Sequence, residues 1–362
     1  MRFTLVLTLL FLMLPHSARG ETILLQGAAQ GTTYHIKFVS PAKDFSAQRL
    51  LTDIERSLGD IDRQMSTYRS DSEISRFNRA SAEEWFAVSP AVVDVVSAAR
   101  VISEQTDGAM DVTVGPLVQL WHSGSKAAKK APSLSPASKV QGAKKEEFAP
   151  PSDEQLRDAR KRVGYKKLEV RAQPPALKKL VDGLEVDLSS IASGYTIDRL
   201  AELLVDRGVK NFMVELGGEV RAKGEREDGT PWRIAIERPT AEKREMAVAV
   251  PLVNAAMATA GGTHKFFEFG GRRYSHIIDP ATGRPVEHSL ASVTVAADTC
   301  IDADGWDTPL LVLGPERGAE IAEKNGIAAM FISHAEGGDA KDAVRTTSAW
   351  RKRFGDEPQP KN

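Results

Sequence analysis

ADGWDTPLLVLG, residues 303–314, places three oxygen-bearing side chains immediately before a strongly apolar run. Asp304, Asp307 and Thr308 stand at i, i+3 and i+4, a spacing that brings side chains to one face of a helical turn. A crowd of hard oxygens is what a magnesium ion carrying a diphosphate prefers. Asp and Thr before an apolar run are also typical of a helix N-cap. The stretch by itself therefore leaves two interpretations open, a cap and a metal site.

Pro309, directly after Thr308, bears on where this helix begins. Proline lacks a backbone N–H and is comfortable only in the first helical turn. We therefore expect the helix to begin at Asp307 or later, with Asp304 on the preceding loop.

Outward from this stretch, strand-like segments come mostly in consecutive runs with helices inserted between them. Residues 32–39 alternate polar and apolar side chains, which is typical of a half-buried strand, and residues 90–104 have helical spacing. Gly270 and Gly271 stand between two strand-like runs and predict a hairpin. Consecutive strands with inserted helices favour an α+β fold over a doubly wound α/β sheet.

Both ends of the chain and one internal segment differ in composition from the rest. Residues 1–20 have the pattern of an export signal, with a basic start, a short apolar run and a small-x-small cleavage motif. Residues 123–151 are rich in Lys, Ala, Ser and Pro, so we expect a mobile insertion. Residues 349–362 predict a polar C-terminal tail. Residues 21–348 are then the expected globular domain.

The charge balance and the cysteine usage exclude several classes of protein. Removal of the signal takes two arginines from the 48 basic residues, which leaves 46 against 49 acidic ones and a formal charge of −3. A nearly neutral chain with few aromatic residues gives no electrostatic footprint for nucleic acid. Cys300 is the only cysteine, so an internal disulfide is excluded and the cleavage motif carries no lipid-attachment cysteine. No segment is long and apolar enough to span a bilayer, so we expect a soluble mature chain.

Two further segments hold polar groups suited to a ligand. In YSHIIDPATGRP, residues 274–285, a strand delivers His276 to a turn, where an imidazole could act as a general base near neutral pH. A lone histidine is more often structural. In VDLSSIASGYTID, residues 186–198, Asp187 and two serines stand where a helix begins. Free N–H groups there suit an anionic ligand, although helix capping alone explains the serines.

The common signatures of P-loop nucleotide binders, zinc proteases and serine hydrolases are absent. GGEVRAKG, residues 217–224, has glycines wrongly spaced for a dinucleotide fingerprint and predicts a tight turn between two strands. Eight motifs occur in the order found in the ApbE family, the FAD:protein FMN transferases. They are QGTTYHI, MSTYRSDSEISRFN, GAMDVTVGPLVQLW, VDLSSIASGYTID, VELGGEVRAKG, ATAGG, YSHIIDPATGRPV and ADGWDTPLLVLG.

The chain therefore resembles this family over nearly the whole expected mature sequence. The resemblance implies a T-fold-like α+β architecture, with mixed or antiparallel sheets packed against helices and with FAD and Mg²⁺ in one cleft. It implies that Asp304, Asp307 and Thr308 bind the metal, joined by the main-chain carbonyl of Ser190, and that His276 assists catalysis. The FAD contacts that it implies are Tyr68, Ala109, Met110, Asp111, Asp187 and Ile278, together with the family positions held here by Gln30 and Ser193.

Three residues depart from the family pattern. Gln30 stands where the family usually has Met, Ser193 where it usually has Lys or Glu, and Ala260 where it usually has Ser. Ser193 matters most, because the loss of a long polar or charged side chain beside the ligand could weaken FAD binding or change the choice of donor.

The activity that the resemblance implies is the movement of FMN from FAD onto a Thr or Ser hydroxyl of a membrane redox subunit, with release of AMP. The chain has no segment like the acceptor motif Asp-x-x-[Ser/Thr]-Gly-Ala-[Ser/Thr], so the acceptor is expected to be a separate protein. The signal predicts export, to the periplasm. Two alternatives stay open: an FAD pyrophosphatase that gives FMN and AMP, and a flavin-binding protein without turnover.

Overall fold

The computed structural model describes residues 20–42, 44–123, 149–239, 246–261, 266–269, 272–334 and 342–355. The predicted signal, nearly all of the predicted insertion, the Gly270–Gly271 turn and residues 356–362 lie outside these ranges. The strands on either side of that turn are described. β11 (Phe266–Phe269) pairs antiparallel with β12 (Arg272–Ser275), with Phe269 opposite Arg272, so the predicted pair of hairpin strands is confirmed.

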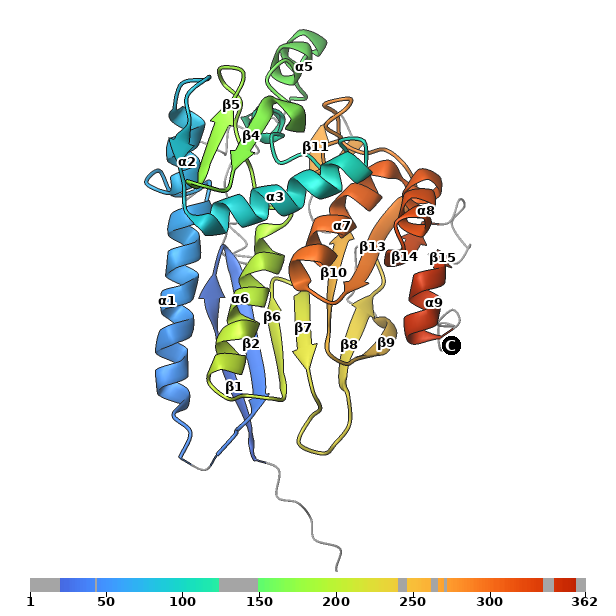
Figure 1. Ribbon diagram of the computed structural model, residues 1–362. Helices are drawn as coiled ribbons and strands as arrows, with labels where there is room; N and C mark the ends of the chain where they lie inside the picture. The colour runs from blue at the N-terminus through green and yellow to red at the C-terminus, as the bar shows by residue number, and fades with distance from the viewer. Residues whose placement is uncertain are drawn as a thin grey trace, which may run out of the picture.

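A sheet of eight strands forms the centre of the fold (Figure 1). All neighbouring strands in it are antiparallel, in the order β1-β2-β6-β7-β10-β13-β14-β15. Helices enter between consecutive runs of strands, so the α+β prediction is confirmed. The strands are β1 (Thr22–Ala29), β2 (Thr32–Val39), β6 (Phe212–Leu216), β7 (Glu219–Lys223), β10 (Ala255–Gly261), β13 (Leu290–Ala297), β14 (Ala328–Ser333) and β15 (Ala343–Thr346).

The two faces of this sheet carry separate cores, because side chains alternate along a strand. In β14, Ala329 and Phe331 belong to one core, and Met330 and Ile332 belong to the other. Helices cover the first face, and a β-hairpin together with the last helix covers the second (Figure 1). The covering elements are α1 (Ala47–Met65), α3 (Pro90–Gln105), α6 (Ala192–Asp206) and α7 (Cys300–Leu313) on the first face, and β8 (Trp232–Glu237), β9 (Met246–Leu252) and α9 (Ser348–Phe354) on the second.

Smaller elements extend the molecule at one end of the helical layer (Figure 1). Three of them form a second antiparallel sheet in the order β3-β5-β4. Glu185 makes an isolated parallel bridge to Val114. The remaining elements are α2 (Glu73–Arg79), β3 (Phe86–Ala87), α4 (Gly115–Ser123), α5 (Asp153–Arg160), the 3₁₀ turn η2 (Tyr165–Lys167), β4 (Leu168–Arg171), β5 (Ala176–Lys179) and α8 (Pro315–Lys324).

Helix α7 begins seven residues earlier than the sequence predicts, at Cys300, so Asp304 lies within the helix and Pro309 in its interior. The expectation of a helix starting at Asp307 is therefore wrong. An interior proline costs about 3 kcal/mol because it loses one hydrogen bond and crowds the preceding turn. The surroundings outweigh this cost, since nine residues of α7 are buried where it packs against α6, β10 and β13.

Helix α9 occupies the described part of the predicted polar tail, so that prediction is wrong for residues 349–354. Thr347 caps the helix by accepting a hydrogen bond from the N–H of Trp350 at 3.3 Å. Trp350 is completely buried, and its ring lies 4.6 Å from that of Phe354. A large aromatic side chain supplies enough apolar area to dock an otherwise polar helix.

Substitution of Asp198 in α6 tests how α6 is joined to α7. Its carboxylate accepts hydrogen bonds from the N–H groups of Cys300 and Ile301, at 2.8 and 2.9 Å, and from Arg221 at 2.6 Å. We expect Asp198→Ala to lower the free energy of unfolding by about 3 kcal/mol, because two helix N–H groups and a partly buried guanidinium lose their acceptor. Chemical denaturation measures the change. Asp206→Ala, at the exposed end of α6, is the control and should stay within about 0.5 kcal/mol; equal losses would contradict the assignment.

Candidate functional site

Helix α6, which carries Ser193, and helix α7, which carries Asp304, Asp307 and Thr308, approach each other closely at Gly194. A Cβ at this position would lie 2.3 Å from the carbonyl oxygen of Cys300 and 2.8 Å from the Cβ of Asp304. The missing side chain allows the N–H of Gly194 to donate to Oδ2 of Asp304 at 2.7 Å. The first turn of α6 therefore lies directly against the acidic face of α7.

Asp304 and Asp307 are almost completely buried on this face of α7, with 4% and 2% of their surface exposed. Burial raises the pKa of both carboxyl groups well above the usual range. The negative charge of Glu219 is the next cause for Asp304, and the charge of Asp304 is the next cause for Asp307. Thr308 donates from Oγ1 to Oδ1 of Asp307 at 3.0 Å. The structure thus gathers the three predicted metal-binding side chains of α7 in one place, where uncompensated negative charge is unfavourable.

Glu219, the first residue of β7, is a third carboxylate at this site that the sequence analysis did not identify. Its charge raises the pKa of both Asp304 and Asp307. It directly follows Gly217 and Gly218, whose positive φ angles of 70° and 120° form the predicted turn between β6 and β7. Glu219 lies in the segment GGEVRAKG, for which the sequence predicted only a tight turn. The two glycines explain that turn by themselves, so nothing in the sequence indicated a role for Glu219.

The loop before α6 is joined to the loop before α4. The N–H of Asp187 donates to the carbonyl oxygen of Val112 at 2.7 Å, and Oγ of Ser190 donates to Sδ of Met110 at 3.7 Å. Two predicted FAD contacts, Met110 and Asp187, and the predicted metal residue Ser190 are therefore brought together.

Asp111 holds the shape of its own loop. Oδ1 accepts from the N–H and the hydroxyl of Thr113 at 2.8 and 2.6 Å, and Oδ2 accepts from the N–H of Tyr165 at 2.9 Å. Burial raises the pKa of Asp111, while these hydrogen bonds act in the opposite direction. Ala109 begins the same turn, with its N–H bonded to the carbonyl oxygen of Thr106 at 3.2 Å. Both carboxylate oxygens of Asp111 are thus used to fix the loop.

Tyr68 lies just beyond the C-terminus of α1, and 81% of its surface is exposed. Partial desolvation of its hydroxyl raises the pKa of Tyr68, and the negative charge of Asp187 raises it further. The hydroxyl is therefore within electrostatic reach of Asp187. An exposed aromatic ring beside this loop is suited to stacking on a planar ligand.

Two of the departures from the family pattern meet at the first turns of α6. Gln30 and Gly31 form the turn between β1 and β2, with φ angles of 51° and 76°. Nε2 of Gln30 donates to Oγ1 of Thr196 at 2.8 Å. Ser193 lies one turn earlier in the same helix and is half-buried. Gln30 thus fastens the β1–β2 turn to the end of α6 that faces Asp304.

His276 directly follows β12, in a loop that is anchored on α4. Ile278, two residues later, is buried together with Trp121 in a small separate core. Nε1 of Trp121 donates to the carbonyl oxygen of Gly283 at 2.9 Å, which ties the far side of the same loop to α4. The loop that carries His276 is thus held by contacts with α4, whereas the acidic cluster of α7 is held by contacts with α6.

The residues on α7 fit a hard divalent cation. Asp304, Asp307 and Thr308 offer two carboxylates and a hydroxyl, which are ligand types that Mg²⁺ prefers. Ser190 directly precedes Ile191, and the side chain of Ile191 packs against Gly305 of α7. A Cβ at Gly305 would lie 3.1 Å from Cδ1 of Ile191. In the part of the chain that the structure describes, no group of three or more His, Cys, Asp or Glu side chains has the arrangement of a metal site. A cation here would therefore depend on hydroxyl, carbonyl and substrate oxygens as well as on the two aspartates.

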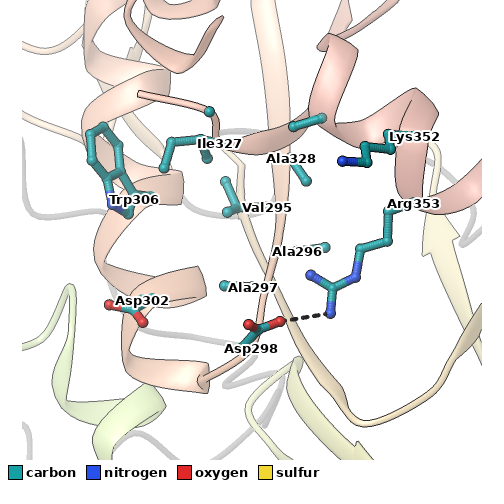
Figure 2. A pocket seen from close by; sticks show the side chains of 12 residues that line it. Val295, Ala296, Ala297, Asp298, Asp302, Trp306, Ile327, Ala328, Lys352 and Arg353 are labelled. Carbon is teal, nitrogen blue, oxygen red and sulfur yellow. Dashed lines mark hydrogen bonds and ion pairs between the residues drawn. The ribbon is translucent and has the colours of Figure 1, made fainter. Parts of the chain in front are cut away.

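A separate hollow of about 520 Å³ lies on the opposite side of α7, between β13, β14 and α9 (Figure 2). Asp302 and Trp306 of α7 line it, and none of the predicted site residues does. Two of its charged groups already pair with each other, since Arg353 contacts Asp298 at 3.1 Å. We therefore locate the candidate site at the acidic face of α7, where the polar groups converge.

Comparison with known proteins decides the family. The model of the ApbE family matches residues 30–331. The chain belongs to the ApbE family. The matched range contains every predicted site residue of the ApbE fold, so the resemblance inferred from the ordered motifs is confirmed.

Relatives of this ApbE chain carry consistent names. The FAD:protein FMN transferase of Vibrio cholerae is 42% identical over 319 residues, which cover 88% of this chain and 90% of the relative. That of Escherichia coli strain K12 is 36% identical over 315 residues, which cover 86% and 84%.

Solved ApbE structures have the same architecture. The flavin transferase ApbE from Vibrio cholerae has a TM-score of 0.78 at 40% identity and covers 92% of this chain and 99% of its own. The apo form of Pseudomonas stutzeri flavinyl transferase ApbE has a TM-score of 0.79 at 36% identity and covers 94% and 99%. The predicted ApbE-type fold is therefore confirmed.

Gly194→Ala tests the close contact between α6 and α7. The added methyl must separate the helices, so we expect a loss of about 1–3 kcal/mol in the free energy of unfolding and a weaker affinity for FAD with Mg²⁺. Gly59→Ala is the control, because a Cβ there meets only Nη1 of Arg63, at 3.5 Å. Alanine at that helical position should raise stability by up to about 1 kcal/mol. Unchanged stability and FAD affinity in Gly194→Ala would refute the close contact.

Asp307→Asn tests the metal assignment without reference to turnover. The substitution removes buried negative charge, so the Tm of the metal-free variant should equal or exceed that of the native protein. Mg²⁺ with FAD should raise the Tm of the native protein by mass action and leave that of the variant nearly unchanged. Differential scanning calorimetry with and without both ligands provides the comparison. An equal shift in the two proteins would mean that Asp307 is not a ligand.

Proposed function

We propose that this protein is an Mg²⁺-dependent FAD:protein FMN transferase. Membership of the ApbE family and the names of its relatives make the chain a transferase with FAD as donor and a protein as acceptor. The observation that supports the proposed reaction is the buried oxygen cluster of Asp304, Asp307 and Thr308 against the first turn of α6. Excess negative charge held away from water favours a bound divalent cation, and such a cation can in turn bind the oxygens of a diphosphate.

The proposed reaction is an in-line displacement at phosphorus. When bound, Mg²⁺ would neutralise the diphosphate of FAD and polarise its bridging oxygen. Asp304, Asp307 and Thr308 would hold that ion together with the carbonyl of Ser190. A Thr or Ser hydroxyl of the acceptor attacks the FMN-side phosphorus, and His276 takes its proton. The bond from phosphorus to the bridging oxygen breaks, and AMP leaves with that oxygen.

The remaining site residues position FAD in this proposal. Asp187 and Tyr68 lie within electrostatic reach of each other at the edge of the site, where they can orient the flavin moiety. The turn of residues 109–111 contributes its backbone, because the carboxylate of Asp111 already accepts three hydrogen bonds from Thr113 and Tyr165. Ile278 supplies an apolar contact, and Gln30 and Ser193 line the end of α6. The short side chain of Ser193 leaves more room beside the ligand than Lys or Glu would.

The acceptor in this proposal is a separate protein with a Thr or Ser flavinylation motif, such as a subunit of a membrane redox complex. No helix in the described ranges is long and apolar enough to cross a membrane. The signal-like residues 1–20 support export to the periplasm, where outward-facing parts of such complexes lie.

In-gel flavin fluorescence of an acceptor domain tests this function. The native protein with FAD and Mg²⁺ should label the acceptor, and Asp307→Asn should lose at least about 100-fold in rate, because one ligand of the diphosphate-bound metal is removed. Asp302→Asn, on the opposite side of the same helix, should retain nearly full activity. Full labelling by Asp307→Asn would overturn the metal assignment, and no labelling by the native protein would overturn the proposed function.

A further inference from the structure

Lys179, the last residue of β5, is one of the most deeply buried side chains, with 1% of its surface exposed. Nζ donates to the carbonyl oxygens of Asn78 and Leu184, at 2.9 and 3.4 Å. It also lies 5.5 Å from the centre of the Phe77 ring. Burial of an ammonium group is costly unless its hydrogens are bonded, and here desolvation lowers the pKa of Lys179. The ammonium group of Lys179 is therefore buried at a cost in free energy and is hydrogen-bonded to two main-chain carbonyls.

Asn78, near the end of α2, links this lysine to a second segment. Its Nδ2 donates to the carbonyl oxygen of Val186 at 2.9 Å, and its Oδ1 accepts from the N–H of Val186 at 2.8 Å. The amide thus fixes both polar groups of one residue, which an apolar side chain cannot do. Lys179 holds the main chain of Asn78 at 2.9 Å and reaches that of Leu184 only at 3.4 Å, so its main link to residues 184–186 runs through Asn78.

The fastened segment leads directly into the candidate site. Asp187 follows Val186, and its N–H is bonded to the loop that carries Met110. Ser190, whose carbonyl is a proposed metal ligand, stands three residues later, before α6 begins. Displacement of Val186 would therefore move the Asp187 carboxylate and the Ser190 carbonyl together.

We propose that Lys179 is a positioning residue for flavin transfer, which acts through Asn78 to hold residues 187–190 in place for the diphosphate of FAD. The inference rests on the proposed function of the site. Lys179 acts through another residue rather than by contact with substrate. Its removal should therefore weaken FAD binding even where the variant is fully folded.

The affinity for FAD in the presence of Mg²⁺ separates this role from a merely structural one. It is measured by flavin fluorescence at a temperature well below the Tm of every variant. Lys179→Met should weaken FAD affinity about tenfold, the lower end of the effect of outer-shell partners. Asn78→Ala should have a similar effect. The double variant should bind no more weakly than the weaker single one, because both act along one path. Hydrogen exchange at the N–H of Asp187 should be faster in each variant.

Lys178→Met is the matched control. Lys178 is the preceding residue of β5 and points to the other face, where it forms an ion pair with Glu169 at 2.7 Å. Its substitution should leave FAD affinity within about twofold, as is usual for changes away from a site.

Three outcomes would overturn the inference. One is unchanged FAD affinity in Lys179→Met, even with a lower Tm, and another is a double variant whose losses multiply. The third is unchanged affinity in Asn78→Ala, which decides the matter if Lys179→Met does not fold. A native protein that binds FAD but labels no acceptor would overturn the proposed function instead, and the affinity comparison would still test the role of Lys179.

Discussion

The hydrogen bond from the N–H of Gly194 to Asp304 joins the first turn of α6 to the middle of α7 at 2.7 Å. It forms only because the glycine has no side chain, since a Cβ would collide with the carbonyl of Cys300. This contact sets the distance between the two helices. Ile191, which directly follows Ser190, also lies against Gly305 of α7, so the geometry of the acidic end of the candidate site depends on this contact.

The same contact brings negative charge into a buried region, where it opposes folding. Asp304 and Asp307 repel each other and Glu219, and burial raises the pKa of both aspartates. Elsewhere along the helix the fold is well fastened: Asp198 binds the first N–H groups of α7 and Arg221. The surroundings thus hold in place a site that is unfavourable until a cation compensates its charge. Functional sites in enzymes commonly show such local cost within a stable frame.

Much of the fold could be predicted from periodicity and composition. In the helix at residues 90–104 and the strand at 32–39, for example, the spacing of apolar residues matches the side that is buried. The start of α7 could not, since local chemistry at Pro309 argues for a later start and only packing against three neighbours overrides it. The helix that contains Trp350 could not be predicted, because most residues around this buried tryptophan are polar. At the site, the spacing of Asp304, Asp307 and Thr308 indicated one face, whereas Glu219 and Lys179 depend on long-range contacts that a sequence does not display.

Intact-mass measurement of an acceptor domain, incubated with the purified protein, FAD and Mg²⁺, shows whether this protein transfers FMN. We expect the acceptor to gain the mass of one FMN joined through a phosphoester, and AMP to appear in equal amount. Free FMN and AMP beside an unmodified acceptor would contradict this expectation and indicate hydrolysis of FAD. FAD recovered unchanged would also contradict it and indicate a flavin-binding protein without turnover.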